Sequence, residues 1–488
     1  MKIGSVPNEV RVVSEKLEEA GYEAYLVGGC VRDLLLGKLP KDWDFTTNAT
    51  PEQIQTVFPD SFYENDFGTV GVKTNSEDQK LAVVEVTPFR MEGKYSDARR
   101  PDEVVWAKTL RDDLERRDFT VNALAYRLKD ESLVDEHSGQ EDLKKKTLRA
   151  VGDARKRFQE DALRMMRAVR LSAELGFAIE TETASAILEN ADNLSRISKE
   201  RIRDELIRTV ETATPMQALC IAQRLGLLKY IMPDLERGIG VEQNQAHSFD
   251  VFEHNVRAMQ HGADKEWPLI IRVAALLHDI SKPETRRWSD EKKDWTFYGH
   301  DVVGSKVAKK ILADLRFPKD FSEKVVNLVR WHMFFSDPDQ ITLSAVRRMI
   351  VNVGEENIWD LLNLRICDRI GTGRPKEQPF RFRKYKSMVE EALRDPISVK
   401  MLAVDGTFLM ESLGMKPGPR IGWTLHALLE DVLEDPKKNT KEFLHDRART
   451  LADLPDDELK KLGESGKDAR EREEEEAVSA IRAKHHVD

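Results

Sequence analysis

The sequence predicts an α+β fold, with a small mixed α/β head over about residues 1–145 and a mostly α-helical remainder. Short β-rich segments are concentrated before residue 140. From about residue 155 to 455, helical periodicity dominates and prolines punctuate it. The last 25 or so residues are charged and nearly free of aromatic side chains, which predicts a frayed helix or disorder.

The head is expected to begin with a helix over residues 8–20, where Val10, Val13 and Leu17 recur at helical spacing before Gly21. The four β-rich segments are residues 25–27, 71–73, 81–88 and 123–128. Residues 90–114, between the third and fourth of these segments, form a polar stretch without strong periodicity. Such a length predicts a mobile loop with a functional role.

Length and composition predict a helix-rich globular protein of two to four domains. The chain has 488 residues, of which 40% are apolar and 34% charged. No run reaches the roughly 18 apolar residues that cross a bilayer, and residues 1–7 lack an apolar signal region. Cys30, Cys220 and Cys367 are far apart, without metal or disulfide spacing. We therefore expect a cytoplasmic, reduced protein with no membrane partner.

The net charge of −10 neither supports nor excludes RNA as a partner, because its distribution decides more than its sum. Residues 142–170 carry ten Lys or Arg against four Asp or Glu, whereas residues 470–477 hold five glutamates. An acidic tail can hide a basic face in the total.

The most informative stretch is residues 27–44, in which a Gly-Gly turn is followed by Arg32 and then by two aspartates. If residues 42–45 form a strand, Asp42 and Asp44 share one face, about 6.6 Å apart along the chain. Carboxylates so placed can hold a pair of Mg²⁺ ions for phosphoryl or nucleotidyl transfer. Gly28 and Gly29 let backbone amides approach a triphosphate. The alternative is a surface Asp-x-Asp beside an ordinary turn.

These residues resemble the signature of class II tRNA nucleotidyltransferases, the CCA-adding enzymes and their bacterial poly(A) polymerase relatives. The resemblance implies that Asp42 and Asp44 bind two Mg²⁺ ions and that Arg32 and the Gly28–Gly29 amides hold triphosphate. It makes Glu85 the third metal-associated carboxylate. Glu85 lies in an apolar run, where a carboxylate is costly unless paired or metal-bound. The alternative places it on the polar face of an edge strand.

A second dense motif is residues 116–123, Arg-Arg-Asp-Phe-Thr-Val-Asn-Ala. Arg117 can neutralise phosphate charge, while Asp118 and Asn122 can hold ribose hydroxyls from one face of a helix. The family that this sequence resembles uses the motif to select ribose over deoxyribose. Residues 90–114 resemble the flexible loop that CCA-adding enzymes of this family need to add the last A. The alternative is a capped surface helix.

The third motif is Glu-Asp-x-x-Arg at residues 160–164. On a helix, Asp161 and Arg164 are i, i+3 neighbours that can read the Watson–Crick edge of C or A and reject U and G. The protein would then be its own template, with Arg167 and Arg170 on the same helix in the nucleotide-binding set. The alternative is an ordinary helix salt bridge. A helix capped by Ser198 would place Arg201 as a support for the site.

A separate constellation of histidines and aspartates begins after residue 247. The adjacent His278 and Asp279 lie in the apolar run 273–280, where both would be unsatisfied without a partner. The pattern resembles the HD phosphohydrolase domain, including Lys282. It implies a site for one or two ions, a divalent transition metal or Mg²⁺, that could generate hydroxide for phosphoester hydrolysis or persist as a scaffold. The implied ligands are His254, His278, Asp279, His300, His332 and Asp368.

Residues 413–422 predict a loop that opens a helix running through residue 433. Backbone amides there, beside Lys416 and Arg420, could bind an RNA phosphate. A tight interhelical turn is the equal alternative.

The resemblance implies five segments: a nucleotidyltransferase head (1–145), an RNA- and nucleotide-binding helical neck (146–240), an HD domain (241–385), a tRNA-binding helical body and tail (386–455) and a charged tail (456–488). The expected activity is addition of C, C and A to the tRNA 3′ end from CTP and ATP, with pyrophosphate released, by a monomer or homodimer.

Three rival functions stay open at this point. The nearest is an A-adding enzyme or poly(A) polymerase of the same family. Another is a phosphohydrolase whose main chemistry is at the HD site. The third is a non-catalytic RNA-binding protein, against which the intact Asp42, Asp44 and Glu85 argue.

Overall fold

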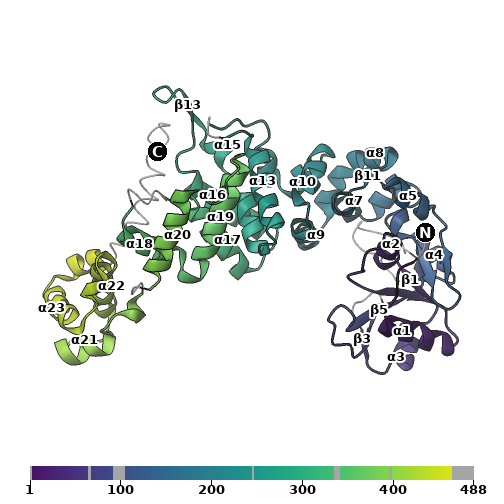
Figure 1. Ribbon diagram of the computed structural model, residues 1–488, viewed down its shortest axis with the longest axis horizontal. Helices are drawn as coiled ribbons and strands as arrows, with labels where there is room; N and C mark the ends of the chain where they lie inside the picture. Colours follow the sequence, from purple (N-terminus) through teal and green to yellow (C-terminus); the bar gives the residue numbers. More distant parts are fainter. Residues whose placement is uncertain are drawn as a thin grey trace. The chain divides into compact units, whose positions relative to one another are not determined.

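The computed structural model describes residues 3–63, 68–91, 105–244, 247–334, 341–394 and 398–463. The chain divides into two compact units, Met1–Ile231 and Met232–Asp488. The first contains a sheet and helices and the second is almost wholly helical, which confirms the predicted α+β class (Figure 1). Among the described residues, no helix has the length and apolar character to span a bilayer.

The head is built on a seven-stranded sheet of order β3-β4-β5-β2-β1-β8-β9. Only the β2–β5 pair is parallel among its neighbours. The four predicted strands are present, and sequence reasoning missed the three-residue strands β3 and β9, which form the two edges. The strands are β1 (Ala24–Val27), β2 (Asp44–Thr47), β3 (Ser61–Tyr63), β4 (Val70–Lys73), β5 (Val83–Pro88), β8 (Ala125–Arg127) and β9 (Ser132–Val134).

The central strand β2 begins at Asp44, so the predicted strand over residues 42–45 starts two residues too early. Asp42 lies in an exposed bend. The physical reason is loss of a partner: β1 pairs Leu26 with Phe45 and ends at Val27, where the chain turns away at Gly28. Asp42 therefore does not share the pleat of Asp44.

Helices pack against this sheet and continue from it as a helical segment. The predicted first helix is confirmed as α1, after which Gly21 adopts φ +88°. A two-stranded parallel ribbon, β10 (Thr147–Leu148) with β11 (Ala178–Ile179), interrupts the helices. The helices of this unit are α1 (Asn8–Glu19), α2 (Gly29–Leu35), α3 (Pro51–Val57), α4 (Leu110–Glu115), α5 (Gly139–Lys145), α6 (Ala154–Glu160), α7 (Leu163–Leu175), α8 (Thr181–Asn190), α9 (Lys199–Glu211), α10 (Pro215–Arg224) and α11 (Leu228–Ile231).

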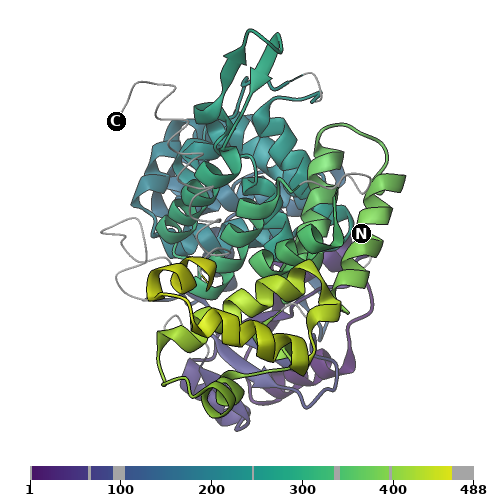
Figure 2. The same ribbon diagram turned by 90° about the vertical axis from the view of Figure 1, so that its left-hand side faces the viewer.

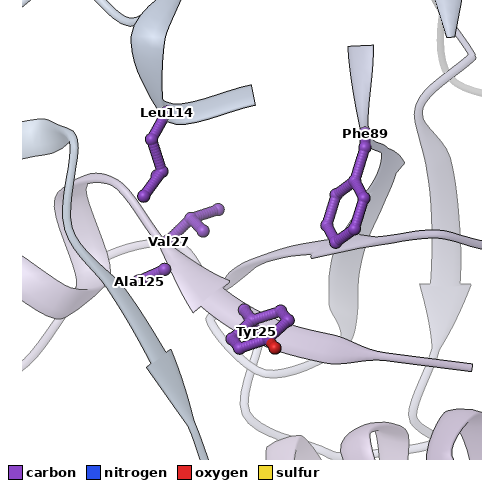
Figure 3. Close-up of a cluster of buried hydrophobic side chains, with 5 residues drawn as sticks. All are labelled: Tyr25, Val27, Phe89, Leu114 and Ala125. Atoms are coloured by element: carbon purple, nitrogen blue, oxygen red, sulfur yellow. The ribbon is translucent and has the colours of Figure 1, made fainter. Parts of the chain in front are cut away.

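A small apolar cluster fixes α4 against the sheet (Figure 3). Tyr25 and Val27 come from β1, Ala125 from β8 and Leu114 from α4, and Phe89 directly follows β5. All five are at most 9% exposed. Because the second sequence motif, residues 116–123, follows α4 directly, this packing sets where that motif meets the sheet.

The predicted mobile loop over residues 90–114 is only partly described. Its flanks pair as an antiparallel ribbon, β6 (Arg90–Met91) with β7 (Val105–Trp106), and its last residues belong to α4. Residues 92–104 lie outside the described residues.

Over its described residues the second unit is helical, as predicted, apart from one hairpin. The hairpin of β12 (Arg287–Ser289) and β13 (Asp294–Thr296) projects from the helices in both views (Figures 1 and 2). Its strands of three residues are too short to register as a periodic pattern. The helices are α12 (Pro233–Glu236), α13 (Val251–Asp264), α14 (Leu269–Leu277), α15 (Lys282–Thr285), α16 (His300–Asp314), α17 (Lys319–Trp331), α18 (Leu343–Val353), α19 (Ile358–Gly371), α20 (Phe380–Ala392), α21 (Gly406–Leu413), α22 (Pro419–Glu434) and α23 (Lys441–Ala452).

Of the charged tail, residues 456–463 are helical, and residues 464–488 lie outside the described residues.

Replacing Leu114 tests the packing of α4. Leu114 is fully buried, so Leu114→Ala should lower the free energy of unfolding by about 2–5 kcal/mol through lost burial and a residual cavity. Urea-induced unfolding measures this. Leu39→Ala is the matched control, because Leu39 is 84% exposed and its loss should change stability by less than about 0.5 kcal/mol. Equal effects of the two variants would contradict the assignment.

Candidate active site and candidate metal centre

Two carboxylates lie side by side on neighbouring strands near the centre of the head sheet. Asp44 of β2 is the in-register partner of Glu85 of β5, and the Glu85 amide donates to the Trp43 carbonyl at 3.0 Å. In-register residues of neighbouring strands project from the same face, about 4.8 Å apart. β5 is paired on both sides, by β4 and β2, so Glu85 is not on an edge strand. Asp42 lies just before β2 and is exposed.

The Gly-Gly turn lies directly beside these carboxylates. Gly28 adopts φ +76°, a left-handed conformation that favours glycine. A Cβ at Gly28 would lie 3.1 Å from Nη1 of Arg117 and 4.0 Å from Oδ2 of Asp44. The turn therefore lies next to both the Asp44 carboxylate of β2 and the Arg117 guanidinium of the second motif. Gly29 opens α2, and a Cβ there would face the Arg32 guanidinium at 3.6 Å.

A buried chain of hydrogen bonds links the first motif to the second. Nη1 of Arg32, a residue 8% exposed, donates to Oδ1 of Asn122 at 2.8 Å. Nδ2 of Asn122 donates to Oδ1 of Asp118 at 3.1 Å. The sequence predicted Asp118 and Asn122 on one helical face. The structure brings them together through a 3₁₀ turn, Thr120–Asn122.

The same chain continues into the helical segment through Arg167 of α7. Nε and Nη2 of Arg167 donate to Oδ2 of Asp118 at 2.8 and 2.7 Å. Burial alone would raise the pKa of Asp118, but the Arg167 guanidinium and the Asn122 hydrogen bond outweigh it and lower the pKa to about 2. Asp118 is therefore a carboxylate at neutral pH.

Arg117 keeps unused donor capacity. Its Nη2 donates to Oδ2 of the buried Asp113 at 3.0 Å, while its Nε is buried without a hydrogen-bond partner. A buried N–H left unpaired is costly, and a phosphate oxygen is a natural acceptor for it. The donor set at this turn thus fits a triphosphate.

The prediction that Asp161 and Arg164 share one continuous helix is wrong. α6 ends at Glu160, and Asp161 is extended (φ −144°, ψ 103°) before α7 begins at Leu163. Oδ1 of Asp161 accepts from the Leu163 amide at 3.1 Å, and this side-chain cap competes with helix continuation. Oδ2 of Asp161 accepts from Arg201 at 2.7 Å, so Arg201 holds the Asp161 carboxylate.

Arg164 is anchored differently from Asp161. Its Nη1 donates to Glu160 at 2.8 Å, and its Nη2 donates to the Arg116 carbonyl at 3.2 Å. Ser198 occupies the N-cap position of α9 without a side-chain cap hydrogen bond.

A cavity of about 410 Å³ gathers most of the predicted nucleotide-binding side chains. Arg170 is not among its lining residues, because its guanidinium pairs with Glu205 at 2.6 Å and with Glu174 at 3.1 Å. Sequence reasoning named Arg201 but missed the rest of this face of α9, whose residues recur at helical spacing as 201, 204, 205 and 208. That spacing was the signal that could have found it. The lining residues are Arg116, Arg117, Asp118, Asp161, Leu163, Arg164, Arg167, Arg201, Asp204, Glu205 and Arg208.

The two predicted RNA-binding residues differ in their surroundings. Lys416 is exposed in the loop before α22. Arg420 lies in the first turn of α22, where its guanidinium contacts Asp456 and donates to the Ala452 and Leu454 carbonyls at 3.0 Å each. It therefore ties α22 to the end of α23, because those helix-terminal carbonyls need donors.

The second unit brings all six predicted metal-ligating residues together, in two groups joined by Asp279. Oδ2 of Asp279 lies 3.1 Å from Nε2 of His254 and 3.3 Å from Nε2 of His278. Its Oδ1 lies 3.2 Å from Nε2 of His300 and 3.6 Å from Nε2 of His332. Oδ1 of Asp368 completes the first group, 3.5 Å from Nε2 of His254.

The histidines of this centre are oriented by backbone carbonyls. Nδ1 of His278, His300 and His332 lies 2.8, 2.6 and 2.7 Å from the carbonyls of Ala275, Phe297 and Val329. A donor Nδ1–H leaves Nε2 as the ligand atom, which is the usual arrangement at histidine metal sites. The Nε2 atoms of these rings therefore meet in the same space, and the donor set fits one or two divalent ions.

The centre is electrostatically crowded. Burial would raise the pKa of Asp279, but Lys282 and His278 hold it well below its usual range. Burial would lower the pKa of His278, but Asp279 and Asp368 raise it to about 10. Nζ of Lys282 lies 2.6 Å from Oδ2 of Asp279. These charges compensate one another in a buried space that a divalent ion could enter.

His247 also belongs to this neighbourhood, and sequence reasoning did not include it. It can form a group of possible ligands with His254 and Asp279. Its Nε2 lies 3.4 Å from Nζ of Lys282, and burial followed by the Lys282 charge lowers its pKa to about 3. Its sequence signal was only its place seven residues before His254.

Three family profiles match successive parts of the chain: the head, the helical segment after it and the histidine-rich part of the second unit. The profile described as "Poly A polymerase head domain" matches residues 24–149. That described as "Probable RNA and SrmB- binding site of polymerase A" matches residues 176–239, and that of the HD domain matches residues 246–368. The fold and these profiles define a nucleotidyltransferase with an HD domain.

Relatives across the chain specify the class further. The CCA-adding enzyme of Limosilactobacillus reuteri is 44% identical over 92% of this chain and 99% of its own. That of Leuconostoc mesenteroides is 45% identical over 47% of this chain and 57% of its own. The Bacillus stearothermophilus CCA-adding enzyme in complex with CTP superposes with a TM-score of 0.68 and 26% identity, over 91% of this chain and 99% of that one. The chain belongs to the family of CCA-adding enzymes. The prediction of a tRNA nucleotidyltransferase is confirmed at that level.

Removing the Arg167 charge should expose the cost of burying Asp118. A depressed pKa contributes stability that is present above the unfolded pKa near 4 and is lost as pH falls toward 2. Arg167→Met should therefore lower the free energy of unfolding by about 2–3 kcal/mol at pH 7. Urea unfolding measures it.

The double variant Asp118→Asn/Arg167→Met provides the control. Its free energy of unfolding should be little lower than that of Arg167→Met alone. The reason is that Asp118→Asn removes the buried charge that Arg167→Met leaves unpaired. Additive losses would show that the two side chains are not coupled.

Proposed function

We propose that this protein adds C, C and A to the 3′ end of tRNA from CTP and ATP, with Asp42, Asp44 and Glu85 as the metal-binding carboxylates. The observation that carries the proposal is the in-register pair Asp44–Glu85 beside the Gly28 turn. Membership in the CCA-adding enzyme family supports the activity. Since tRNA and nucleoside triphosphates meet in the cytoplasm, we place the reaction there.

The residues around the carboxylates suit a nucleoside triphosphate. Two Mg²⁺ ions bound there would supply stabilisation of charge on the reacting phosphate. Gly28 lets backbone amides approach the triphosphate, and Arg117 offers its unpaired Nε–H. Arg32 already holds Asn122, and we assign Asn122 and Asp118 to the ribose hydroxyls.

Base selection belongs to the cavity lined by Asp161 and Arg164 in this proposal. Asp161 can accept from the exocyclic amine shared by C and A, and Arg164 can donate to ring and carbonyl acceptors. Arg201 positions Asp161 through its 2.7 Å contact. Arg167 positions Asp118, whereas Arg170 braces α7 against α9 through Glu205. Lys416 is assigned to a tRNA phosphate.

Asp44→Asn tests the carboxylate assignment. Incorporation of labelled CTP and ATP should fall about 10³-fold or more on tRNA transcripts ending before CCA, after C and after CC. CTP binding should persist in part, because the arginines and the glycine turn are unchanged. Asp60→Asn is the matched control, since Asp60 is exposed on the same domain.

The wild-type products identify the reaction. Two C residues followed by one A, then a stop, support full CCA addition. Addition of A only after CC indicates an A-adding enzyme, and long A tails indicate a poly(A) polymerase. Unchanged incorporation in Asp44→Asn would refute the metal assignment.

A second activity, phosphoester hydrolysis at the HD site, is favoured by one observation. Asp279 joins two groups of buried ligand atoms, His254, His278 and Asp368 on one side and His300 and His332 on the other. Ions of the Mg²⁺ or transition-metal class bound there would supply an activated water. Asp279 and the Nε2 atoms would hold them, and Lys282 would hold the Asp279 carboxylate in place.

His278→Ala separates the two activities. Mn²⁺ affinity, measured by calorimetry, should fall at least tenfold, and hydrolysis of bis(p-nitrophenyl) phosphate should be lost. CTP incorporation should be unchanged, because the head carries that reaction. His445→Ala, on α23, is the control for replacing a histidine. Metal binding equal to wild type in His278→Ala would contradict the ligand assignment.

A further inference from the structure

The metal centre of the second unit opens into a cleft of about 1290 Å³. Typical small-molecule sites measure roughly 300–1,000 Å³. One wall is the end of the β12–β13 hairpin with its following turn, residues 292–301. The other is formed by parts of α19 and α20 and the residues between them. The size therefore suits an extended substrate better than a lone phosphate.

A strongly basic segment, residues 374–386, leads away from this cleft. It carries six Lys or Arg and one acid, Glu377, in a chain whose net charge is −10. Glu377 is already engaged, 2.7 Å from Nζ of Lys265. Arg374 and Arg383 are exposed and have no ion-pair partner among the described residues. We call residues 374–386 the basic segment.

The positive charge continues into the cleft wall. Arg369 lines the cleft and donates through Nε to a neutral acceptor, the Lys376 carbonyl, at 2.6 Å. Arg365 and Arg374 line the same cleft. Arg365 is paired with the ligand Asp368. Like charges held this close are stabilised when an anion lies among them.

Exposed aromatic rings complete the cleft. Tyr298 is 60% exposed and Phe380 is 71% exposed, and both line it. The Tyr298 hydroxyl accepts from Nζ of Lys292 at 2.7 Å. The hairpin behind it is stiffened by the Arg286 guanidinium, 3.6 Å from the centre of the Trp295 ring. Figure 2 shows this hairpin standing clear of the helices.

We propose that this cleft binds a single-stranded nucleic acid, with backbone phosphates along the basic segment and bases stacked on Tyr298 and Phe380. A positive groove interleaved with exposed aromatic rings is how single strands are held without base-specific contacts. A phosphate of the strand then lies over the metal centre. Binding of the strand does not depend on the proposed hydrolytic role of that centre. Only cleavage of the bound strand would rest on that role.

Fluorescence anisotropy with an unstructured, labelled RNA octamer tests the proposal. The octamer carries a 3′-phosphate, so that it cannot act as a primer in the head. Binding to the full-length protein is measured with Mg²⁺ and with EDTA. Tyr298→Ala and Phe380→Ala should each weaken binding about tenfold. Arg374→Gln/Arg383→Gln should reduce the slope of log affinity against log salt by about 1.4.

Lys309→Gln/Lys310→Gln is the matched control, because both lysines are exposed on α16. It should leave affinity and salt slope unchanged. Wild-type affinity in both aromatic variants would overturn the proposal. So would a base-free polyphosphate of equal charge that competes as well as the RNA, since charge alone would then explain binding.

The two proposals for this centre fail in different ways. RNA binding without hydrolysis of bis(p-nitrophenyl) phosphate would refute the hydrolytic role and support the cleft assignment. Hydrolysis without RNA binding would refute the cleft assignment alone.

Discussion

The contact between Asp118 and Arg167 is the constraint on which the head site depends. A carboxylate with 9% of its surface exposed must be paired, and its partner comes from α7, outside the sheet. Through Asn122 the same carboxylate reaches Arg32 and the Gly-Gly turn. One buried charge therefore fixes the turn, the 3₁₀ segment and α7 in a single arrangement.

The second unit obeys the same rule with histidines in place of arginines. Asp279 is 2% exposed, and its two oxygens are shared between two pairs of histidines and Lys282. Burying these groups is costly unless each has a partner. So many buried polar groups can be brought together only where several helices converge. The six residues come from the ends as well as the middles of those helices.

Residue types indicated which side chains gather in the structure better than periodicity predicted the local geometry. Asp44 was singled out with the Gly-Gly turn, Glu85 by its apolar run together with the family resemblance, and the six HD residues by the resemblance to the HD domain. Asp161 and Arg164 were expected on one helix, but the Asp161 cap breaks it. Arg420 was expected to face RNA, yet carbonyls at the end of α23 take its donors. Both differences come from local hydrogen bonds that spacing alone does not reveal.

By itself the sequence determined the α+β class, the order of the motifs and the side chains able to hold nucleotide or metal, because these follow from residue type and local spacing. Only the tertiary structure decided which of them meet. The Asp44–Glu85 register, the Asp161–Arg201 pair and the bridging place of Asp279 join residues that lie on different strands or helices. Their contacts are set by how strands pair and helices pack, since a buried charge is tolerated only where its partner arrives.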